Sequence, residues 1–278
     1  MNTTRKPRSL MLNRKFVRFE TNVDDPAVPF GVGVIRLDRP KVNALNRAMQ
    51  TELVAACHEA DQSRAVKVVV VYGGQRAFAA GADVKEFATR TQGDMIREGD
   101  AISKTISAVA AIKKPVIAAV ERLALGGGFE IAIAADFRVS SSNALWGLPE
   151  ILLGVLPAAG GTQRLPRIVG ASRAKMLMFT GESITGSAAA EIGLVDQVCD
   201  EGQALNAAFA MANRFVNRAP LALAAVKSAV DLSFDTALDV GLRAESFLSQ
   251  SMYATDDARA GIESFVRNGP GTANFVGE

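Results

Sequence analysis

Residues 115–141 read PVIAAVERLALGGGFEIAIAADFRVSS, and this stretch decides the fold class. Residues 115–120 are small or β-branched and apolar, which predicts a buried strand. A glycine-rich turn then leads into an apolar helix over residues 129–136, and a second strand pattern covers residues 137–141. A strand, a helix and another strand in this order indicate an α/β core with parallel pairing.

The same alternation extends towards the N-terminus, where Asn46 is placed to cap a helix over residues 47–61. The polar, weakly periodic residues 89–100 predict a mobile loop that leads into a helix. Beyond residue 200 no strand pattern interrupts the helical ones. The remaining strand patterns cover residues 15–20, 31–37 and 66–71, and the C-terminal helical patterns cover residues 204–217, 221–232, 236–249 and 256–266.

These patterns divide the 278 residues into three parts. We expect a disordered basic tail over residues 1–14, an α/β core over residues 15–200, and a helical oligomerisation region over residues 201–278. A transit peptide is the other interpretation of the Arg-rich, acid-poor start of the chain. A chain of this length can bury a sizeable core without disulfides or metals.

The charge and the hydropathy of the chain narrow the choice of partners. With 31 basic and 29 acidic residues the net charge is only +2, so no strong field favours a nucleic acid or a membrane surface. No apolar run approaches the roughly 18 residues of a membrane span. We therefore expect neither a nucleic-acid partner nor a membrane.

The histidine and cysteine content argues against several kinds of site. His58 is the only histidine, it lies in a helical pattern, and no nucleophile motif accompanies it. Cys57 and Cys199 form no C-x-x-C motif, which speaks against a metal ribbon and suits a reducing compartment. The sequence predicts a cytoplasmic protein without a metal site.

Two glutamates lie in apolar surroundings and are candidates for acid–base chemistry. Glu130 follows the Gly126–Gly128 run, whose free N–H groups at a helix start favour a negative oxygen. Glu150 lies in the equally apolar segment ALWGLPEILLGVLP. Two carboxylates in separate apolar settings are what enzymes use as acid and base near neutral pH. Packing glycines and a carboxylate that caps its own helix are the alternatives.

The segment AFAAGADVKEF, residues 77–87, contains a second glycine turn. Small residues around Gly81 leave the backbone amides accessible to a ligand. Asp83 is placed to cap the helix that follows, and Lys85 offers a cation within its first turn. An ordinary left-handed turn before a capped helix is the alternative interpretation.

The segments at residues 77–87, 113–141 and 146–170 together resemble the enoyl-CoA hydratase/isomerase (crotonase) superfamily. The third segment reads WGLPEILLGVLPAAGGTQRLPRIVG. The resemblance covers residues 16–198 closely and remains visible in ATDDARAGIESFV. It implies an α/β fold, a crotonase-like spiral of ββα units followed by a C-terminal helical trimerisation region. It also implies a homotrimer, or a hexamer built from two trimers.

The resemblance further implies an acyl-CoA substrate and names the residues that would meet it. The amides of Ala82 and Gly127 would form an oxyanion hole, and Glu130 and Glu150 would be the catalytic pair. The implied reaction is hydration of a trans-2-enoyl-CoA in fatty acid β-oxidation, without a cofactor. Other acyl-CoA reactions of the superfamily, namely isomerisation, a specialised dehydration or thioester hydrolysis, are the alternative. The substrate-binding residues implied are Ala80, Ala82, Asp83, Val84, Lys85 and Gly127, with the Ala80 carbonyl at the adenine and Lys85 near the phosphates.

Two departures from the family pattern affect these expectations. Trp146 stands where phenylalanine is common, so the packing of the pocket is expected to differ. The C-terminal tail SFVRNGPGTANF has Arg267 as its only basic residue, which weakens the expectation that the tail reaches coenzyme A.

Overall fold

The computed structural model describes residues 14–89, 91–98 and 100–278. The tail predicted over residues 1–14 lies outside these residues, apart from Arg14, which forms an ion pair with Glu59. No helix within the described ranges is both long and apolar enough to cross a membrane.

The main sheet has six strands in the order β1-β2-β3-β4-β6-β9. β1 pairs with β2 antiparallel, and every other neighbouring pair is parallel. The register pairs Val34 with Val70 and Val71 with Ala118, so the β-branched runs lie side by side. The six strands are Val17–Glu20, Val32–Leu37, Val68–Tyr72, Val116–Val120, Phe137–Ser141 and Gln197–Cys199.

A small second sheet has the strand order β5-β7-β8. Its strands alternate along the chain with strands of the main sheet, so the chain follows a spiral path. After β4 the chain adds β5 (Leu123–Leu125) to the small sheet and enters α5 (Gly127–Ala134). After β6 it adds β7 (Leu145–Gly147) and enters the 3-10 helix η1 (Pro149–Leu153). β8 (Ser183–Thr185) closes this sheet antiparallel to β7. These repeated β–β–helix units are those of the crotonase-like spiral that the sequence predicted.

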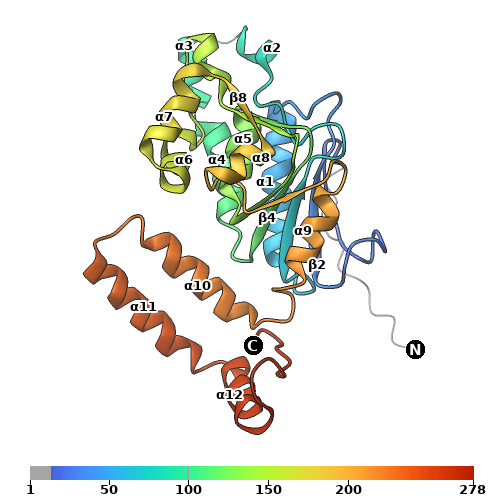
Figure 1. The fold of residues 1–278 in the computed structure, drawn as a ribbon, viewed down its shortest axis with the longest axis vertical. Coiled ribbons are helices and arrows are strands. Elements are labelled where there is room, and N and C mark those ends of the chain that lie inside the picture. Colours follow the sequence, from blue (N-terminus) through green and yellow to red (C-terminus); the bar gives the residue numbers. More distant parts are fainter. Residues whose placement is uncertain (1–13, 90, 99) are drawn as a thin grey trace.

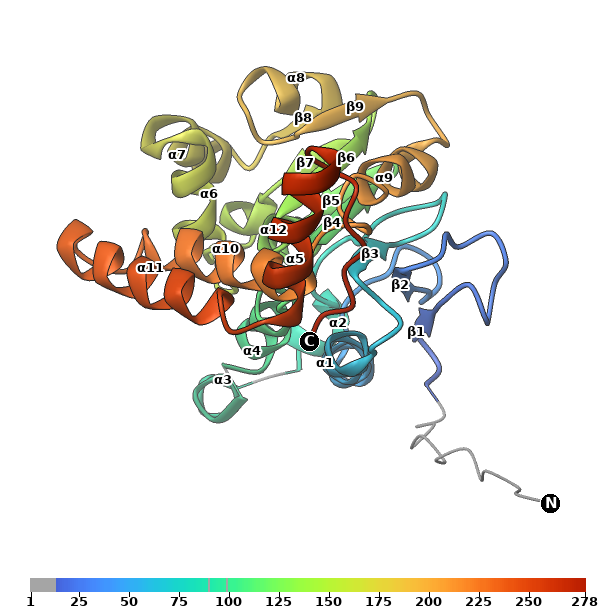
Figure 2. The same cartoon turned by 90° about the horizontal axis from the view of Figure 1, so that it is seen from below.

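Helices cover both faces of the main sheet, as Figure 2 shows from below. On one face Ile35, Val69 and Ala118 pack in a core with α1 (Arg47–Gln62), α4 (Asp100–Ala110) and α5. On the other face Val34, Val70 and Ile117 pack with α9 (Ala204–Ala212). Successive strand residues therefore face different cores, which explains why these strands read as unbroken apolar runs.

Side-chain caps begin several of the helices, among them α1 and α12 (Asp256–Asn268). Asn46 caps α1 by accepting a hydrogen bond of 3.0 Å from the Met49 amide, as predicted. The loop predicted over residues 89–100 was wrong for Gln92–Glu98, which form helix α3. The Thr91 amide donates to the Asp94 carboxylate at 2.9 Å, and the Asp94 amide donates to the Thr91 hydroxyl at 3.2 Å. This reciprocal pair caps the start of α3. The other short helices of the core are α2 (Val84–Phe87), α6 (Gly161–Val169), α7 (Ala171–Thr180) and α8 (Gly186–Glu191).

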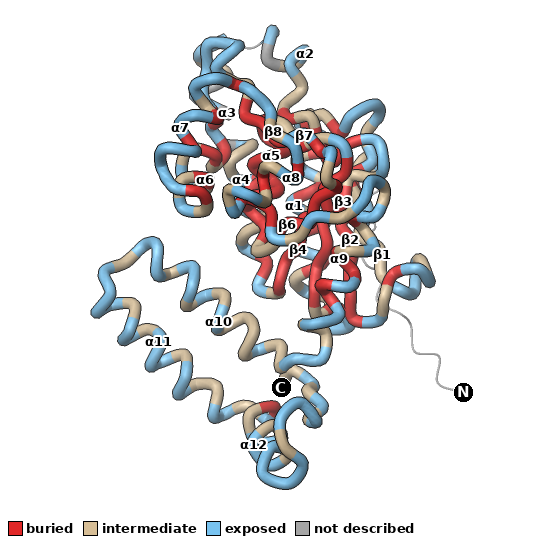
Figure 3. Tube along the Cα trace, viewed as in Figure 1, coloured by how far each residue is buried: buried red, intermediate tan, exposed pale blue. Residues whose placement is uncertain are grey.

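Three C-terminal helices stand away from the sheet in Figure 1: α10 (Pro220–Leu232), α11 (Leu238–Met252) and α12 (Asp256–Asn268). Neither α10 nor α11 contains a buried residue, and Figure 3 shows this region as mostly exposed or intermediate. Large apolar side chains of these two helices point to solvent, among them Val226, Leu238 and Phe247. Such surface is typical of an interaction face.

Candidate active site

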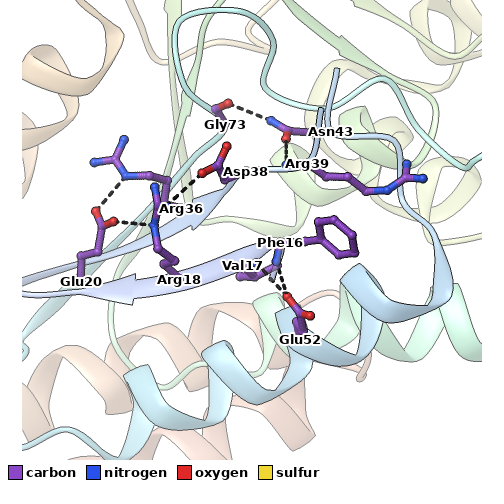
Figure 4. A network of polar contacts seen from close by, with 10 residues as sticks. All are labelled: Phe16, Val17, Arg18, Glu20, Arg36, Asp38, Arg39, Asn43, Glu52 and Gly73. Atoms are coloured by element: carbon purple, nitrogen blue, oxygen red, sulfur yellow. Dashed lines mark hydrogen bonds and ion pairs between the residues drawn. The ribbon is translucent and has the colours of Figure 1, made fainter. Parts of the chain in front are cut away.

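A turn held by Asn43 supports the first glycine segment. The Asn43 backbone adopts φ 53°, and its side-chain amide donates to the carbonyls of Gly73, Ala77 and Phe78 at 2.7–3.0 Å. Figure 4 shows the contact with Gly73 and the one between Asn43 and Arg39. The same turn pairs with residues 80–83, since the Leu45 amide donates to the Gly81 carbonyl at 2.7 Å. Residues 79–82 are thus fixed from one side by this turn.

The start of α5 packs against these residues from the other side. A Cβ at Gly128 would overlap the Ala79 carbonyl, so the two backbones meet closely only because this residue is glycine. A Cβ at Gly127 would lie 3.8 Å from the Ala82 nitrogen, and one at Gly81 would lie 3.2 Å from the Gly127 nitrogen. Within the described residues neither the Ala82 nor the Gly127 amide donates a hydrogen bond to the chain. Two available N–H groups are therefore neighbours.

Glu130 lies in the first turn of α5 and is only 2% exposed. Its Oε1 accepts hydrogen bonds of 2.8 Å from the amides of Ala159 and Gly161. Gly161 is the first residue of α6, so the carboxylate also faces the positive end of that helix. Burial raises the pKa of Glu130, and the two amides and the Arg164 cation oppose that rise.

Glu150 lies in η1, which Pro149 begins, as the sequence predicted. Its Oε1 lies 2.8 Å from the position of a Cβ at Gly126, directly before the start of α5. Its Oε2 is buried and has no hydrogen-bond partner in the described chain. Burial, with a further contribution from the charge of Glu130, raises the pKa of Glu150 to about 7. The two carboxyl groups therefore lie close to the same helix start in different settings.

The other residues predicted to bind substrate follow directly after Gly81. The Asp83 carboxylate bonds Arg39 at 2.7 Å and caps α2 through the Lys85 amide at 3.2 Å, as the sequence predicted. Its hydrogen bond with Arg39 holds the pKa of Asp83 below its usual range. Val84 and Lys85 are exposed, and the Ala80 amide donates to the Val42 carbonyl at 2.9 Å.

Sequence reasoning missed the amides that hold Glu130. They belong to the AAGG segment at residues 158–161, and the small-residue argument applied to residues 79–82 would have indicated them as well. It also missed Arg164, because an arginine in the amphipathic run TQRLPR looks like an ordinary surface residue.

Trp146 is fully buried behind the helix that carries Glu130. Its indole N–H donates to the Ser140 hydroxyl at 3.0 Å, and its ring meets Phe129 edge-on with centroids 5.6 Å apart. Trp146 thus supports α5 from the core.

At the C-terminus, the amides of Val276 and Gly277 donate to the buried Asp257 carboxylate, so the last residues fold back onto α12.

Comparison with known proteins gives a family match over most of the chain. The model of the enoyl-CoA hydratase/isomerase family matches residues 28–272. The chain belongs to this family.

Curated relatives in the family cover most of the chain. The short-chain-enoyl-CoA hydratase of Clostridium acetobutylicum is 37% identical over 237 residues, which is 84% of this chain and 91% of the relative. The 2,3-dehydroadipyl-CoA hydratase of Escherichia coli is 40% identical over 235 residues, with the same coverage. A solved enoyl-CoA hydratase of Bacillus anthracis superposes with a TM-score of 0.87 at 32% identity, covering 95% of this chain and all of that one.

The raised pKa of Glu150 predicts a pH-dependent effect of Glu150→Gln on stability. The folded carboxyl keeps its proton up to about pH 7, against 4.5 for an ordinary glutamate, so its contribution to stability is full below pH 4.5 and is lost as the pH rises through 7. The glutamine side chain of the variant carries no charge to desolvate. The melting temperature of the variant relative to wild type should therefore increase between pH 5 and pH 8, as measured by calorimetry at matched protein concentration. The exposed Glu191→Gln is the control, and a difference that does not change with pH would contradict the assignment.

Proposed function

We propose that this protein hydrates trans-2-enoyl-CoA thioesters to 3-hydroxyacyl-CoA. The observation that carries the proposal is the arrangement of two carboxyl groups around a helix start with two available amides: Glu130 is buried, and Glu150 is half-buried with its Oε2 atom enclosed. Membership of the family and the names of the hydratase relatives support the same reaction.

Glu130 is the proposed base. Hydrogen bonds from the Ala159 and Gly161 amides favour its ionised form, and they leave Oε2 to take a proton from water. That water attacks the β-carbon of the enoyl group. Because the amides of Ala159 and Gly161 both bond its Oε1, the Glu130 carboxylate needs little reorganisation when the proton moves.

Glu150 is the proposed acid. A pKa of about 7 keeps a substantial fraction of this carboxyl protonated near neutral pH, so it can deliver a proton to the α-carbon. Its unpartnered Oε2 is a buried polar atom that a bound water or substrate group would satisfy. The charge of Glu130 raises the pKa of Glu150, which favours one proton on the pair rather than none.

The amides of Ala82 and Gly127 are the proposed oxyanion hole. Negative charge builds on the thioester oxygen when water adds to the β-carbon, and two aligned N–H groups stabilise it. Removal of one such donor typically costs about 3–4 kcal/mol of transition-state stabilisation. The reaction moves only protons and water, so the proposal includes no metal or redox cofactor.

Residues 80–85 are proposed to meet coenzyme A. The exposed Lys85 offers a cation to the phosphates, and the Ala80 carbonyl offers an acceptor to the adenine. Val84 supplies exposed apolar surface beside them. The Asp83 side chain is bonded to Arg39, so its part in the proposal is to hold the segment.

Oligomeric state, pathway and location complete the proposal. A homotrimer, or a hexamer of two trimers, would cover the apolar side chains that α10 and α11 expose, and a monomer in light scattering at micromolar concentration would contradict it. Fatty acid β-oxidation is the proposed pathway. The cytoplasm is the proposed compartment, because Cys57 and Cys199 form no disulfide.

Kinetics of two variants test the acid–base assignment. Glu130→Gln and Glu150→Gln should each lower kcat on crotonyl-CoA by at least about 100-fold, because each removes a proton donor or acceptor. The loss of enone absorbance measures turnover, and Glu191→Gln is the matched control. Near-normal kcat in both folded variants would refute the assignment. Chromatography of products from a panel of acyl-CoAs separates hydration from isomerisation, dehydration of another acyl-CoA and thioester hydrolysis.

A complex with acetoacetyl-CoA tests the oxyanion hole. The thioester oxygen should lie within about 2.7–3.1 Å of the Ala82 and Gly127 nitrogens, as expected for donors that stabilise an oxyanion. A crystal structure of the complex provides the measurement. A thioester oxygen that is bound by side chains or by water instead would rule out the two amides.

A further inference from the structure

Arg164 lies behind the two amides that hold Glu130. Its guanidinium Nη1 donates to the Ala159 carbonyl at 3.3 Å, while the Ala159 and Gly161 amides donate to Glu130 Oε1 at 2.8 Å. The peptide units of one turn are thus bonded to Arg164 on one side and to Glu130 on the other.

Gly160 makes room for this arrangement. The residue has φ 116°, and a Cβ at this position would overlap the Arg164 Nη1. Any side chain at residue 160 would therefore displace the guanidinium from the turn. The next arginine of the same helix, Arg167, is exposed and bonds the Gln163 carbonyl of its own helix at 2.8 Å.

We infer that Arg164 is a positioning residue for Glu130, whose guanidinium fixes the turn at residues 159–161 and keeps a positive charge beside the carboxylate. The inference rests on the proposed function, in which Glu130 is the base. Arg164 touches neither the reacting water nor the thioester in this scheme, since it acts through the turn.

The charges around this pair are few. Arg164 on α6 is the charge that acts on the Glu130 carboxyl, and Glu130 in turn acts on Glu150 on η1. Asp231 on α10 acts, together with Glu130, on the Arg164 guanidinium. Asp231 is itself influenced by Lys227, Asp136 and Asp235. The cation of Arg164 lowers the pKa of Glu130 against the effect of burial. Loss of the cation should therefore raise that pKa.

Arg164→Gln, Arg164→Lys and the control Arg167→Gln test the inference in the full-length protein. Arg164→Gln should lower kcat on crotonyl-CoA by at least about tenfold, because the base is displaced, with KM changed less than about twofold. The acidic limb of the kcat/KM profile should move to higher pH. Arg164→Lys should recover part of both effects, and Arg167→Gln should match wild type.

An infrared titration of the carboxyl band that Glu130→Gln abolishes provides a readout independent of turnover. The Glu130 pKa should rise in Arg164→Gln. If wild type hydrates no enoyl-CoA but this rise is observed, the proposed function fails and the positioning role stands. An unchanged titration in folded Arg164→Gln, or an equal shift in Arg167→Gln, would overturn the inference.

Arg164→Met covers the case in which Arg164→Gln does not fold, because the unbranched apolar side chain fills much of the same space without a charge. The Glu130 pKa should rise in this variant as well. An unchanged infrared titration in folded Arg164→Met would count against the inference.

Discussion

The close approach of residues 79–82 to the start of α5 is the contact on which the site depends. The Ala79 carbonyl occupies the space that a side chain at Gly128 would need. This contact brings the Ala82 and Gly127 amides together, although they belong to different repeats of the spiral. The segment is also paired with the Asn43 turn, so the Ala82 amide cannot move without breaking several hydrogen bonds, and the Gly127 amide is held by the start of α5. Both amides would therefore act as preorganised donors in the proposed oxyanion hole, and preorganisation is where such a site gains most of its effect.

The same helix start explains why two similar side chains differ. Glu130 points from α5 towards the first amides of α6, where backbone dipoles and Arg164 stabilise its charge. Glu150 lies on η1 beside Gly126, where no donor reaches its Oε2 within the described residues. Burial raises the pKa of both groups. Two amides of another segment oppose that rise at Glu130, whereas the backbone contribution at Glu150 comes from its own amide. The proposed division into base and acid rests on this difference in the surroundings of the two carboxyl groups.

The sequence predicted five of the six strands of the main sheet, and its central strands were clearest because they are apolar and buried on both faces. The edge strand β9 was not predicted, because its three residues are too few to show a pattern. Phe137–Ser141 was predicted to the residue, and Asn46 fixed the start of α1. The small sheet was not predicted, since strands of three residues such as Leu145–Gly147 are too short to show a period. Both glutamates stood out because a charge among apolar residues is unusual, and the structure brings them to one helix start. Arg164 did not stand out, because its role comes from where its side chain lies rather than from its neighbours in sequence.

Four backbone amides stabilise the negative charges in the proposed mechanism. Those of Ala82 and Gly127 would bind the thioester oxygen, and those of Ala159 and Gly161 bond the Glu130 carboxylate. The position of a backbone amide is set by the path of the chain and not by a particular side chain. Small residues at these four positions keep the amides accessible, while the acidic and basic side chains of the site can differ. In the proposed mechanism the two carboxyl groups then determine which proton is taken from water and which is delivered to the α-carbon. A scaffold of this kind can keep its oxyanion hole while its acid and base differ, which fits a family whose name joins hydratases and isomerases. Having both carboxyl groups, each in its own electrostatic setting, is what favours hydration for this member.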